Sequence, residues 1–310
     1  MPKIDSPASP IVSQLKGLHL FHFDGAPCAQ RVRFALGEKG LARGREDTFD
    51  AVTPQSLQGE DDRWVSRIVS LAKKEHISPA YAQIHPNMVV PALVHDGQLY
   101  LESLDIIAYL DNAFGGPRLI PQQSPLLNDT MALVEQAKQL HVSLRYVSFR
   151  WGLGRLAMLK PKERARLKEL AGQGSDDENL VSFYGAYSTR TIPNSVFEEH
   201  LLQLYNAFEA LDSQLSDGRL YLLGETLTIA DVFWAMKLLR LIETGYPVAE
   251  HHPELYEWYL RMYARPAFQN EVMARNRMSY RFFRAKSGIE NVMGLGLKQA
   301  TARIRTSHRG

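Results

Sequence analysis

The stretch from Val89 to Ser103 constrains the fold of this chain more than any other, because it specifies three consecutive elements. Val90-Pro91 opens an apolar run that ends at Asp96-Gly97, and a second apolar run follows. An Asp-Gly pair between two apolar runs predicts a β-hairpin. Ser103 is expected to cap the helix after it. A carboxylate at Glu102 and a helix N-terminus beside strand backbone would form a pocket for a peptide-like ligand with an ammonium and a carboxylate group.

Length and composition place the chain among ordinary globular proteins. Its 310 residues allow about two domains. A formal net charge of +2, from 36 basic and 34 acidic residues, gives no electrostatic footprint for nucleic acid. The sequence shows no apolar run of transmembrane length and no secretory signal in its first 16 residues. The single cysteine excludes an intrachain disulfide and fits a reducing compartment, so we expect a cytoplasmic protein.

The first half of the chain alternates strand-like and helix-like patterns. Residues 1–17 are expected to form a flexible leader, and residues 18–114 one domain with the order βαβ, then a helical segment, then ββα. Pro27 suits the first position of a helix that ends near Gly40. Strands are predicted at residues 18–23 and 45–51, and a helix at residues 60–75.

The second half has helical periodicity. We expect a linker at residues 115–125, a helical domain at 126–283 and a basic tail at 284–310. Thr228 and Asp231 have the spacing of a capping box at a helix start. The tail is predicted to be mobile; the alternative is a helix that docks over the site or onto an anionic surface. The histidines show no metal-ligand spacing, so no metal site is expected.

This order of motifs resembles the glutathione transferase superfamily along residues 18–270. Val90-Pro91, Glu102-Ser103, the helix start at residues 224–231 and the segment from His252-Pro253 to Arg265-Pro266 carry the resemblance. The resemblance implies an α/β plus all-α architecture: a thioredoxin-like N-terminal domain followed by an all-helical C-terminal domain. It also implies a homodimer that uses glutathione.

The resemblance assigns roles to the residues around the hairpin. The backbone of Val90, before a cis Pro91, would pair with the cysteinyl amide of glutathione. Glu102 would accept a hydrogen bond from the γ-glutamyl ammonium group, and Ser103 would bind the carboxylate. The ordinary alternatives are a plain N-cap for Ser103 and a solvated charge at a helix start for Glu102.

The turn before the first helix resembles the zeta-class pattern, Ser-Ser-Cys followed by Arg-Val-Arg. Cys28 and Arg31 match this pattern, whereas Ala26 and Pro27 replace the two serines. The expected hydroxyl donor is therefore missing. Cys28 at the helix N-terminus, the backbone N–H groups of Cys28 and Ala29, or the positive potential of Arg31 would stabilise the glutathione sulfur instead.

Cys28 and Arg31 also fit purely structural roles. Cys28 would then be a small buried apolar residue, and Arg31 part of an interdomain salt bridge. The chain has no Cys-x-x-Cys motif, which excludes a dithiol redox cycle.

A second substrate would lie against the first long helices of the helical domain. Tyr146, Phe149, Arg150 and Trp151 would form an aromatic pocket with one cationic group there, unless they are ordinary core residues. The long stretch from residue 153 to 194 is similar in layout to bacterial β-aryl-ether-cleaving transferases and to the ganglioside-induced differentiation-associated group.

Three functions are compatible with these patterns. The leading hypothesis is a glutathione transferase that attacks a hydrophobic, aromatic electrophile by conjugation, dehalogenation or ether cleavage. The alternatives are a non-catalytic binding or scaffold protein with the same fold, and a glutathione-dependent isomerase.

Overall fold

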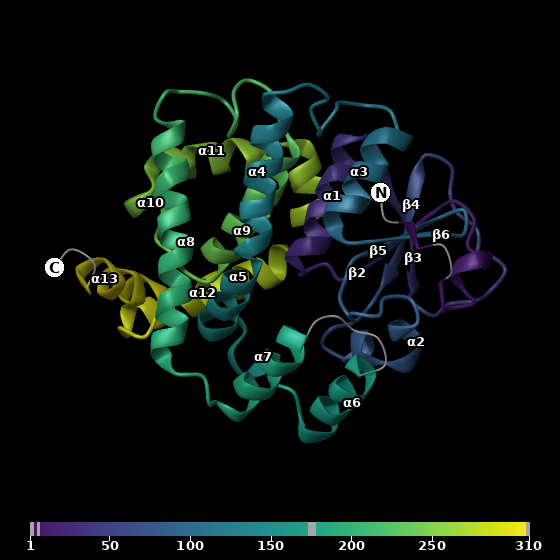
Figure 1. Cartoon of the computed structure of the whole chain (residues 1–310), viewed down its shortest axis with the longest axis horizontal. Coiled ribbons are helices and arrows are strands. Elements are labelled where there is room, and N and C mark those ends of the chain that lie inside the picture. Colours follow the sequence, from purple (N-terminus) through teal and green to yellow (C-terminus); the bar gives the residue numbers. More distant parts are fainter. Residues whose placement is uncertain (1–2, 5–6, 173–177, 308–310) are drawn as a thin grey trace. The chain divides into compact units, whose positions relative to one another are not determined.

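The computed structural model describes residues 3–4, 7–172 and 178–307. The chain divides into two compact units: unit 1 is Met1–Pro117 with Met158–Thr191, and unit 2 is Arg118–Ala157 with Ile192–Gly310. Unit 1 contains a sheet and its helices, whereas the described part of unit 2 is helical (Figure 1).

Unit 1 is built on one six-stranded sheet in the order β1-β6-β5-β2-β4-β3. Its strands are β1 (Lys3–Ile4), β2 (Leu18–His22), β3 (Ala42–Thr48), β4 (Arg63–Ile68), β5 (Ala92–His95) and β6 (Gln98–Leu101). Strands β2, β4 and β3 are parallel, and β5, β6 and β1 continue the sheet with antiparallel pairings. The longer helices of its N-terminal segment, α1 (Pro27–Glu38) and α3 (Ser103–Ala113), pack against each other.

The hairpin and the first helix confirm the sequence predictions. β5 pairs with β6, and both Asp96 and Gly97 in the turn have positive φ, 48° and 77°. This is the conformation that Asp-Gly turns supply at low cost. Helix α1 begins at Pro27 and is followed by Gly40, whose φ is 77°. These elements depend on local sequence, which is why they were predictable.

The helix predicted at residues 60–75 is wrong, because residues 63–68 form strand β4. This strand lies between β2 and β3 and is buried along most of its length. Its central side chains are all buried: Trp64 and Val65 are apolar, and Ser66 and Arg67 are hydrogen-bonded inside the protein. The sequence therefore lacks the alternation of buried apolar and exposed polar residues that is typical of a strand with one solvent-facing side. The Arg67 guanidinium donates to the carbonyls of Phe49, Ala51 and Ser56 and thereby holds the loop that connects β3 with β4.

The N-terminal residues are not a flexible leader throughout. Residues 12–14 form a 3-10 helix, η1 (Val12–Gln14). Ile11, Val12 and Leu15 are buried in a cluster with Phe21 and other core residues. Pro2, Pro7 and Pro10 suggested a flexible leader, but the apolar side chains that follow Pro10 pack in this core cluster and order the segment.

The segment from Met158 to Thr191 belongs to unit 1, which corrects its expected place in the helical domain. Helices α6 (Pro161–Ala171) and α7 (Glu178–Thr189) follow each other there. Leu159 and Leu167 pack with Ile77 and Met88, beside η2 (Glu75–Ile77) and α2 (Pro79–Ala82) (Figure 1). Sequence periodicity predicts that a segment is helical, but it does not predict which other elements the apolar side of the helix packs against.

The described part of unit 2 is formed by helices around a central buried one, α9 (Ile229–Glu243). The others are α4 (Leu126–Gln139), α5 (His141–Val147), η3 (Ser148–Leu153), η4 (Gly154–Ala157), α8 (Asn194–Leu215), α10 (Val248–His251), α11 (Pro253–Ala264), η5 (Phe268–Met273), α12 (Arg277–Val292) and α13 (Leu297–Ser307).

The predicted capping box at the start of α9 is confirmed. The Asp231 carboxylate accepts hydrogen bonds from the backbone N–H and hydroxyl of Thr228, from the Leu222 N–H and from Trp258 Nε1. Burial nevertheless raises the pKa of Asp231 above its ordinary value, because desolvation penalises the charged form. One side chain thus connects the helix start, a preceding turn and α11.

Replacing Asp231 with alanine is expected to lower the free energy of unfolding by about 4 kcal/mol, because four buried donors lose their acceptor. Urea denaturation measures the change. Asp217→Ala is the matched control, since Asp217 lies on the surface and pairs only locally with Arg219. Equal stability losses in both variants would contradict this account.

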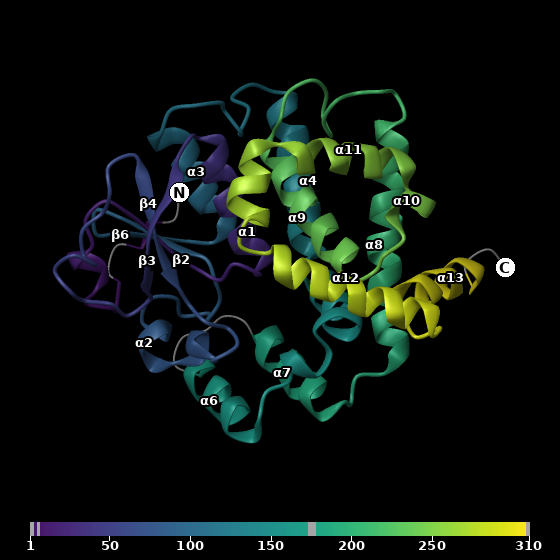
Figure 2. The same cartoon turned by 180° about the vertical axis from the view of Figure 1, so that it is seen from behind.

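The basic segment that we expected to be a mobile tail is helical. Helix α13 buries Leu297, Ala300 and Ile304, and it packs on α8. Figure 2 shows α12 and α13 as consecutive helices at the C-terminal end of the described chain. The apolar residues of α13 recur at helical spacing and bury one side of the helix, which orders the segment although it is rich in basic residues. In the part of the chain that the structure describes, no helix is long and apolar enough to cross a membrane.

Candidate active site

The register of the sheet brings three separate segments to one edge. Ala92, at the start of β5, pairs with Phe21 of β2 on one side and with Leu101 of β6 on the other. The turn after β2, the Val90-Pro91 pair before β5 and the Glu102-Ser103 pair after β6 therefore all lie at the same edge. Sequence motifs up to 80 residues apart become neighbours by strand pairing alone.

The backbone before β5 has the conformation that the resemblance implied, because the Val90–Pro91 peptide bond is cis. The Tyr81 hydroxyl donates a 2.8 Å hydrogen bond to the Val89 carbonyl. Burial raises the pKa of Tyr81 far above its ordinary value, so this hydroxyl stays protonated and remains a donor. Helix α2 thus holds the segment that would present Val90 to a peptide-like ligand.

The hairpin ends in a strained residue, which corrects the predicted helix start. Helix α3 begins at Ser103 rather than after it, and Glu102 occupies the N-cap with φ 61° and ψ 127°. A non-glycine residue in this region costs about 1–3 kcal/mol and is found mainly at functional sites. Glu102 is exposed, whereas Ser103 in the first turn of α3 is buried and only 6% exposed.

Arg31 links the two ends of the candidate site. Its Nη1 lies 3.6 Å from the sulfur of Cys28 and 3.5 Å from Oγ of Ser103, and the residue is 2% exposed. Cys28 is partly exposed in the first turn of α1, where backbone N–H groups point out of the helix end. The predicted residues Cys28, Arg31 and Ser103 are therefore in direct contact, with a cation between the thiol and the hydroxyl.

Sequence reasoning missed a second arginine that organises the same turn. Arg33 donates to the carboxylate and the backbone carbonyl of Asp24, and Arg43 donates to the same carboxylate at 2.6 Å. Arg43 also lies 4.9 Å from the ring of Trp64. Because residues 31 and 33 are about 200° apart on a helix, Arg31 serves the site and Arg33 the turn before it. The Arg-Val-Arg spacing in the sequence could have indicated that the two arginines point to different sides of α1.

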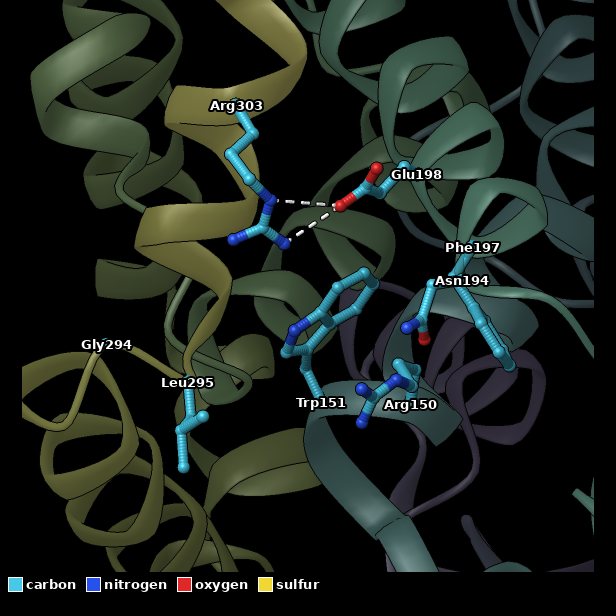
Figure 3. Close-up of a pocket in the computed structure, with 8 residues that line it drawn as sticks. All are labelled: Arg150, Trp151, Asn194, Phe197, Glu198, Gly294, Leu295 and Arg303. Carbon is cyan, nitrogen blue, oxygen red and sulfur yellow. Dashed lines mark hydrogen bonds and ion pairs between the residues drawn. The ribbon is translucent and has the colours of Figure 1, made fainter.

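Two of the predicted substrate residues line a cavity of about 130 Å³ in unit 2. Figure 3 shows Arg150 and Trp151 of η3 together with residues of α8, of the α12–α13 turn and of α13. The lining residues are Arg150, Trp151, Asn194, Phe197, Glu198, Gly294, Leu295 and Arg303. Arg150 lies 5.7 Å from the Trp151 ring and 5.9 Å from the Phe197 ring. Arg303 pairs with Glu198 at 2.8 Å.

The other two predicted substrate residues do not line this cavity. The Tyr146 ring packs against His200 at 4.1 Å and against Phe197, a lining residue of the cavity, at 5.8 Å. Phe149 is partly buried on η3, the π-helix that also carries Arg150 and Trp151. Their role in binding a substrate stays a prediction.

Fold and site together define a class: a thioredoxin-like domain with a cis-proline and an acid–hydroxyl pair, joined to a helical domain. The glutathione S-transferase N-terminal domain family matches residues 20–118, and the glutathione S-transferase C-terminal domain family matches residues 178–266. The chain belongs to the glutathione S-transferase family.

Several relatives are similar over most of their length. Glutathione S-transferase theta-1 of Mus musculus is 25% identical over 197 residues, which are 63% of this chain and 70% of the relative. The 2,5-dichlorohydroquinone reductive dechlorinase of Sphingobium indicum is 24% identical over 82% of both chains. The crystal structure of β-etherase LigF from Sphingobium sp. strain SYK-6 has a TM-score of 0.66 at 21% identity, over 81% of this chain and 97% of that one, and shows the shared fold.

Proposed function

We propose that this protein is a glutathione-dependent transferase that attacks a hydrophobic, aromatic electrophile with the glutathione thiolate. The observation that carries this proposal is the Arg31 side chain, which contacts both Cys28 and Ser103 in unit 1. A single cation next to a sulfur position and a carboxylate position suits a ligand that presents both groups. We further propose a cytoplasmic homodimer, as the family resemblance implies.

Each end of glutathione has a suitable partner at the sheet edge. Glu102 would accept from its α-ammonium group, and Ser103, at the N-terminus of α3, would donate to its α-carboxylate. The backbone of Val90, held before cis Pro91, would pair with the cysteinyl amide. The strained backbone at Glu102 supports a binding role, since a solvated charge at a helix start needs no such conformation.

The chemistry follows from the first turn of α1. The helix end, the Cys28 thiol as a donor and the Arg31 cation would favour the thiolate of bound glutathione over its thiol. This thiolate forms a bond to an electron-poor carbon of the second substrate, and the leaving group, a halide or aryloxide, departs with the electron pair. No hydroxyl is needed at positions 26 and 27 for this mechanism.

The second substrate is proposed to use the cavity in unit 2. Trp151 and Phe197 offer aromatic walls, and Arg150 offers a cation for a phenolate or carboxylate. The printed names of two relatives, a dichlorohydroquinone dechlorinase and a β-etherase, are consistent with an aromatic substrate that carries an oxygen substituent.

Replacing Cys28 with alanine tests the sulfur role. We expect about a tenfold lower kcat with a chlorinated nitroaromatic probe and a changed pH profile, because a donor to the thiolate is lost, while glutathione still binds in calorimetry. Ala29→Ser, on the neighbouring buried position, controls for local packing. Unchanged turnover and an unchanged pH profile would favour the backbone N–H groups instead.

The same measurements separate the alternatives. No heat of glutathione binding to the wild-type protein at millimolar concentration would overturn the transferase and favour a scaffold protein. Release of unchanged glutathione together with an isomerised product would favour a glutathione-dependent isomerase.

A further inference from the structure

The exposed apolar side chains of the described residues are concentrated on α12 and the turn after it. Those with high exposure are Met278 (86%), Phe282 (60%), Ile289 (62%), Val292 (91%), Met293 (65%) and Leu295 (66%). Elsewhere in the described chain such residues occur singly, for example Val52 and Leu156. A contiguous exposed apolar surface on a water-soluble helix needs an explanation by function.

These residues form one narrow stripe along the helix. At about 100° per residue, Met278, Phe282, Ile289 and Val292 fall within a sector of about 80°. Exposed Ala285 lies in the same sector. We call these five residues the α12 stripe. The opposite side of α12 carries Ser287, which is 1% exposed and lies against the turn at Gly245.

Polar contacts hold α12 in this orientation. Arg284 donates to the Ile242 carbonyl at 3.0 Å, Lys286 to the Trp151 carbonyl at 3.1 Å, and Asn291 to the Gly245 carbonyl at 3.2 Å. Arg284 and Asn291 lie on the side of the helix away from the α12 stripe, and Lys286 lies at the edge of the stripe. The stripe therefore faces outward because the other side of α12 is anchored, not because the helix is loosely placed.

Basic side chains border the α12 stripe. Exposed Arg277 and Arg281 lie along one flank, and Lys286 lies on the other. The acid of α12, Glu290, is paired with Lys286 at 2.8 Å. The surface thus combines an apolar stripe with an excess of positive charge, which is the pattern of helices that lie in the interface of an anionic bilayer.

We infer that α12 docks this protein on an anionic lipid surface, with the α12 stripe inserted among the lipids and Arg277 and Arg281 among the headgroups. Charge favours this occupant over a second copy of the chain. A second copy of the chain would bring the same excess of positive charge to the contact, and like charges repel. An anionic headgroup layer neutralises them.

Co-sedimentation with vesicles tests the inference. The full-length protein is expected to bind vesicles of phosphatidylcholine with phosphatidylserine, to bind pure phosphatidylcholine weakly, and to be released by about 0.5 M NaCl. Arg277→Gln with Arg281→Gln should weaken binding about 30-fold, from about 1 kcal/mol per base. Phe282→Gln with Ile289→Gln should weaken it at least about tenfold.

Controls distinguish docking from a general loss of hydrophobic surface. Val142→Gln with Leu260→Gln changes two other exposed apolar positions of unit 2, each 39% exposed, and should leave binding unchanged. Glutathione affinity and thermal unfolding should be unaffected in all variants. The inference is overturned if the wild-type protein does not bind anionic vesicles, or if the α12 variants bind as wild type does. It is also overturned if Phe282→Gln with Ile289→Gln instead dissociates a dimer in analytical ultracentrifugation.

Discussion

Replacing Arg31 with alanine is expected to lower kcat/KM for the glutathione reaction by about 100-fold or more. The Arg31 guanidinium contacts both Cys28 and Ser103, so its removal takes a cation from the sulfur and from the carboxylate position at once. Hydrogen bonds to charged groups contribute about 1.5–3 kcal/mol each. Steady-state kinetics, with glutathione as the varied substrate, measure the loss. Arg31→Lys should recover part of it, because the charge remains but the planar group does not.

A second buried base at the other end of α1 provides the control. Lys39 pairs with Asp111 at 2.9 Å, and both side chains are about 1% exposed. Lys39→Met with Asp111→Leu replaces the whole ion pair, which should change stability but not glutathione affinity. If Arg31→Ala is folded and keeps kcat/KM within about threefold of wild type, Arg31 has only a structural role.

Lowering the pH from 8 to 5 is expected to reduce the free energy of unfolding through four buried histidines, which is a large effect for a protein of marginal stability. Burial lowers the pKa of His19, His76 and His85 to about 4 and that of His252 to about 3. In the unfolded chain these groups titrate near 6.5. The unfolded state therefore binds more protons below pH 6.5, so stability is complete above this value and falls as the pH approaches 4. Each histidine costs about 2 kcal/mol at pH 5.

The environments of these histidines show why they resist protonation. His19 receives a hydrogen bond from Arg67 Nε at Nδ1 and contacts the Lys16 carbonyl through Nε2, so the ring is a neutral Nε2–H tautomer beside a cation. Among the described residues, neither ring nitrogen of His85 has a hydrogen-bond partner, and the side chain is 1% exposed. A charge there would be buried without compensation.

His85→Gln isolates one of these contributions. The difference in unfolding free energy between pH 8 and pH 5, measured by urea denaturation, should shrink by about 2 kcal/mol in this variant. Tyr81→Phe is the control, since it removes a nearby buried hydrogen bond that does not titrate in this range and should destabilise equally at both pH values. An unchanged pH dependence in His85→Gln would mean that His85 is accessible to protons in the folded state.

Some features of the site were predictable because they depend on neighbouring residues in the sequence. The Asp96-Gly97 turn, Pro27 at the start of α1 and the Thr228–Asp231 capping box all follow local backbone preferences. The helix start at Ser103 was placed one residue too late. Glu102 has a positive φ where the hairpin joins α3, and no local preference of glutamate indicates it.

Non-local pairing explains the other differences. β4 was mistaken for a helix because Trp64, Ile68 and Leu71 have helical spacing, although strands on both sides decide its conformation. Helices α6 and α7 were assigned to the wrong unit because periodicity does not identify the partner of an apolar face.

The sequence by itself determined the order of elements, the thioredoxin-like and helical halves, and the motifs that identify the glutathione S-transferase family, because these depend on short-range patterns. Only the tertiary structure decided that Arg31 spans Cys28 and Ser103 while Arg33 turns to Asp24. Likewise, only packing converted the basic tail into an anchored helix with an outward apolar stripe. Contacts between distant segments depend on strand register and buried surface, which no local sequence pattern encodes.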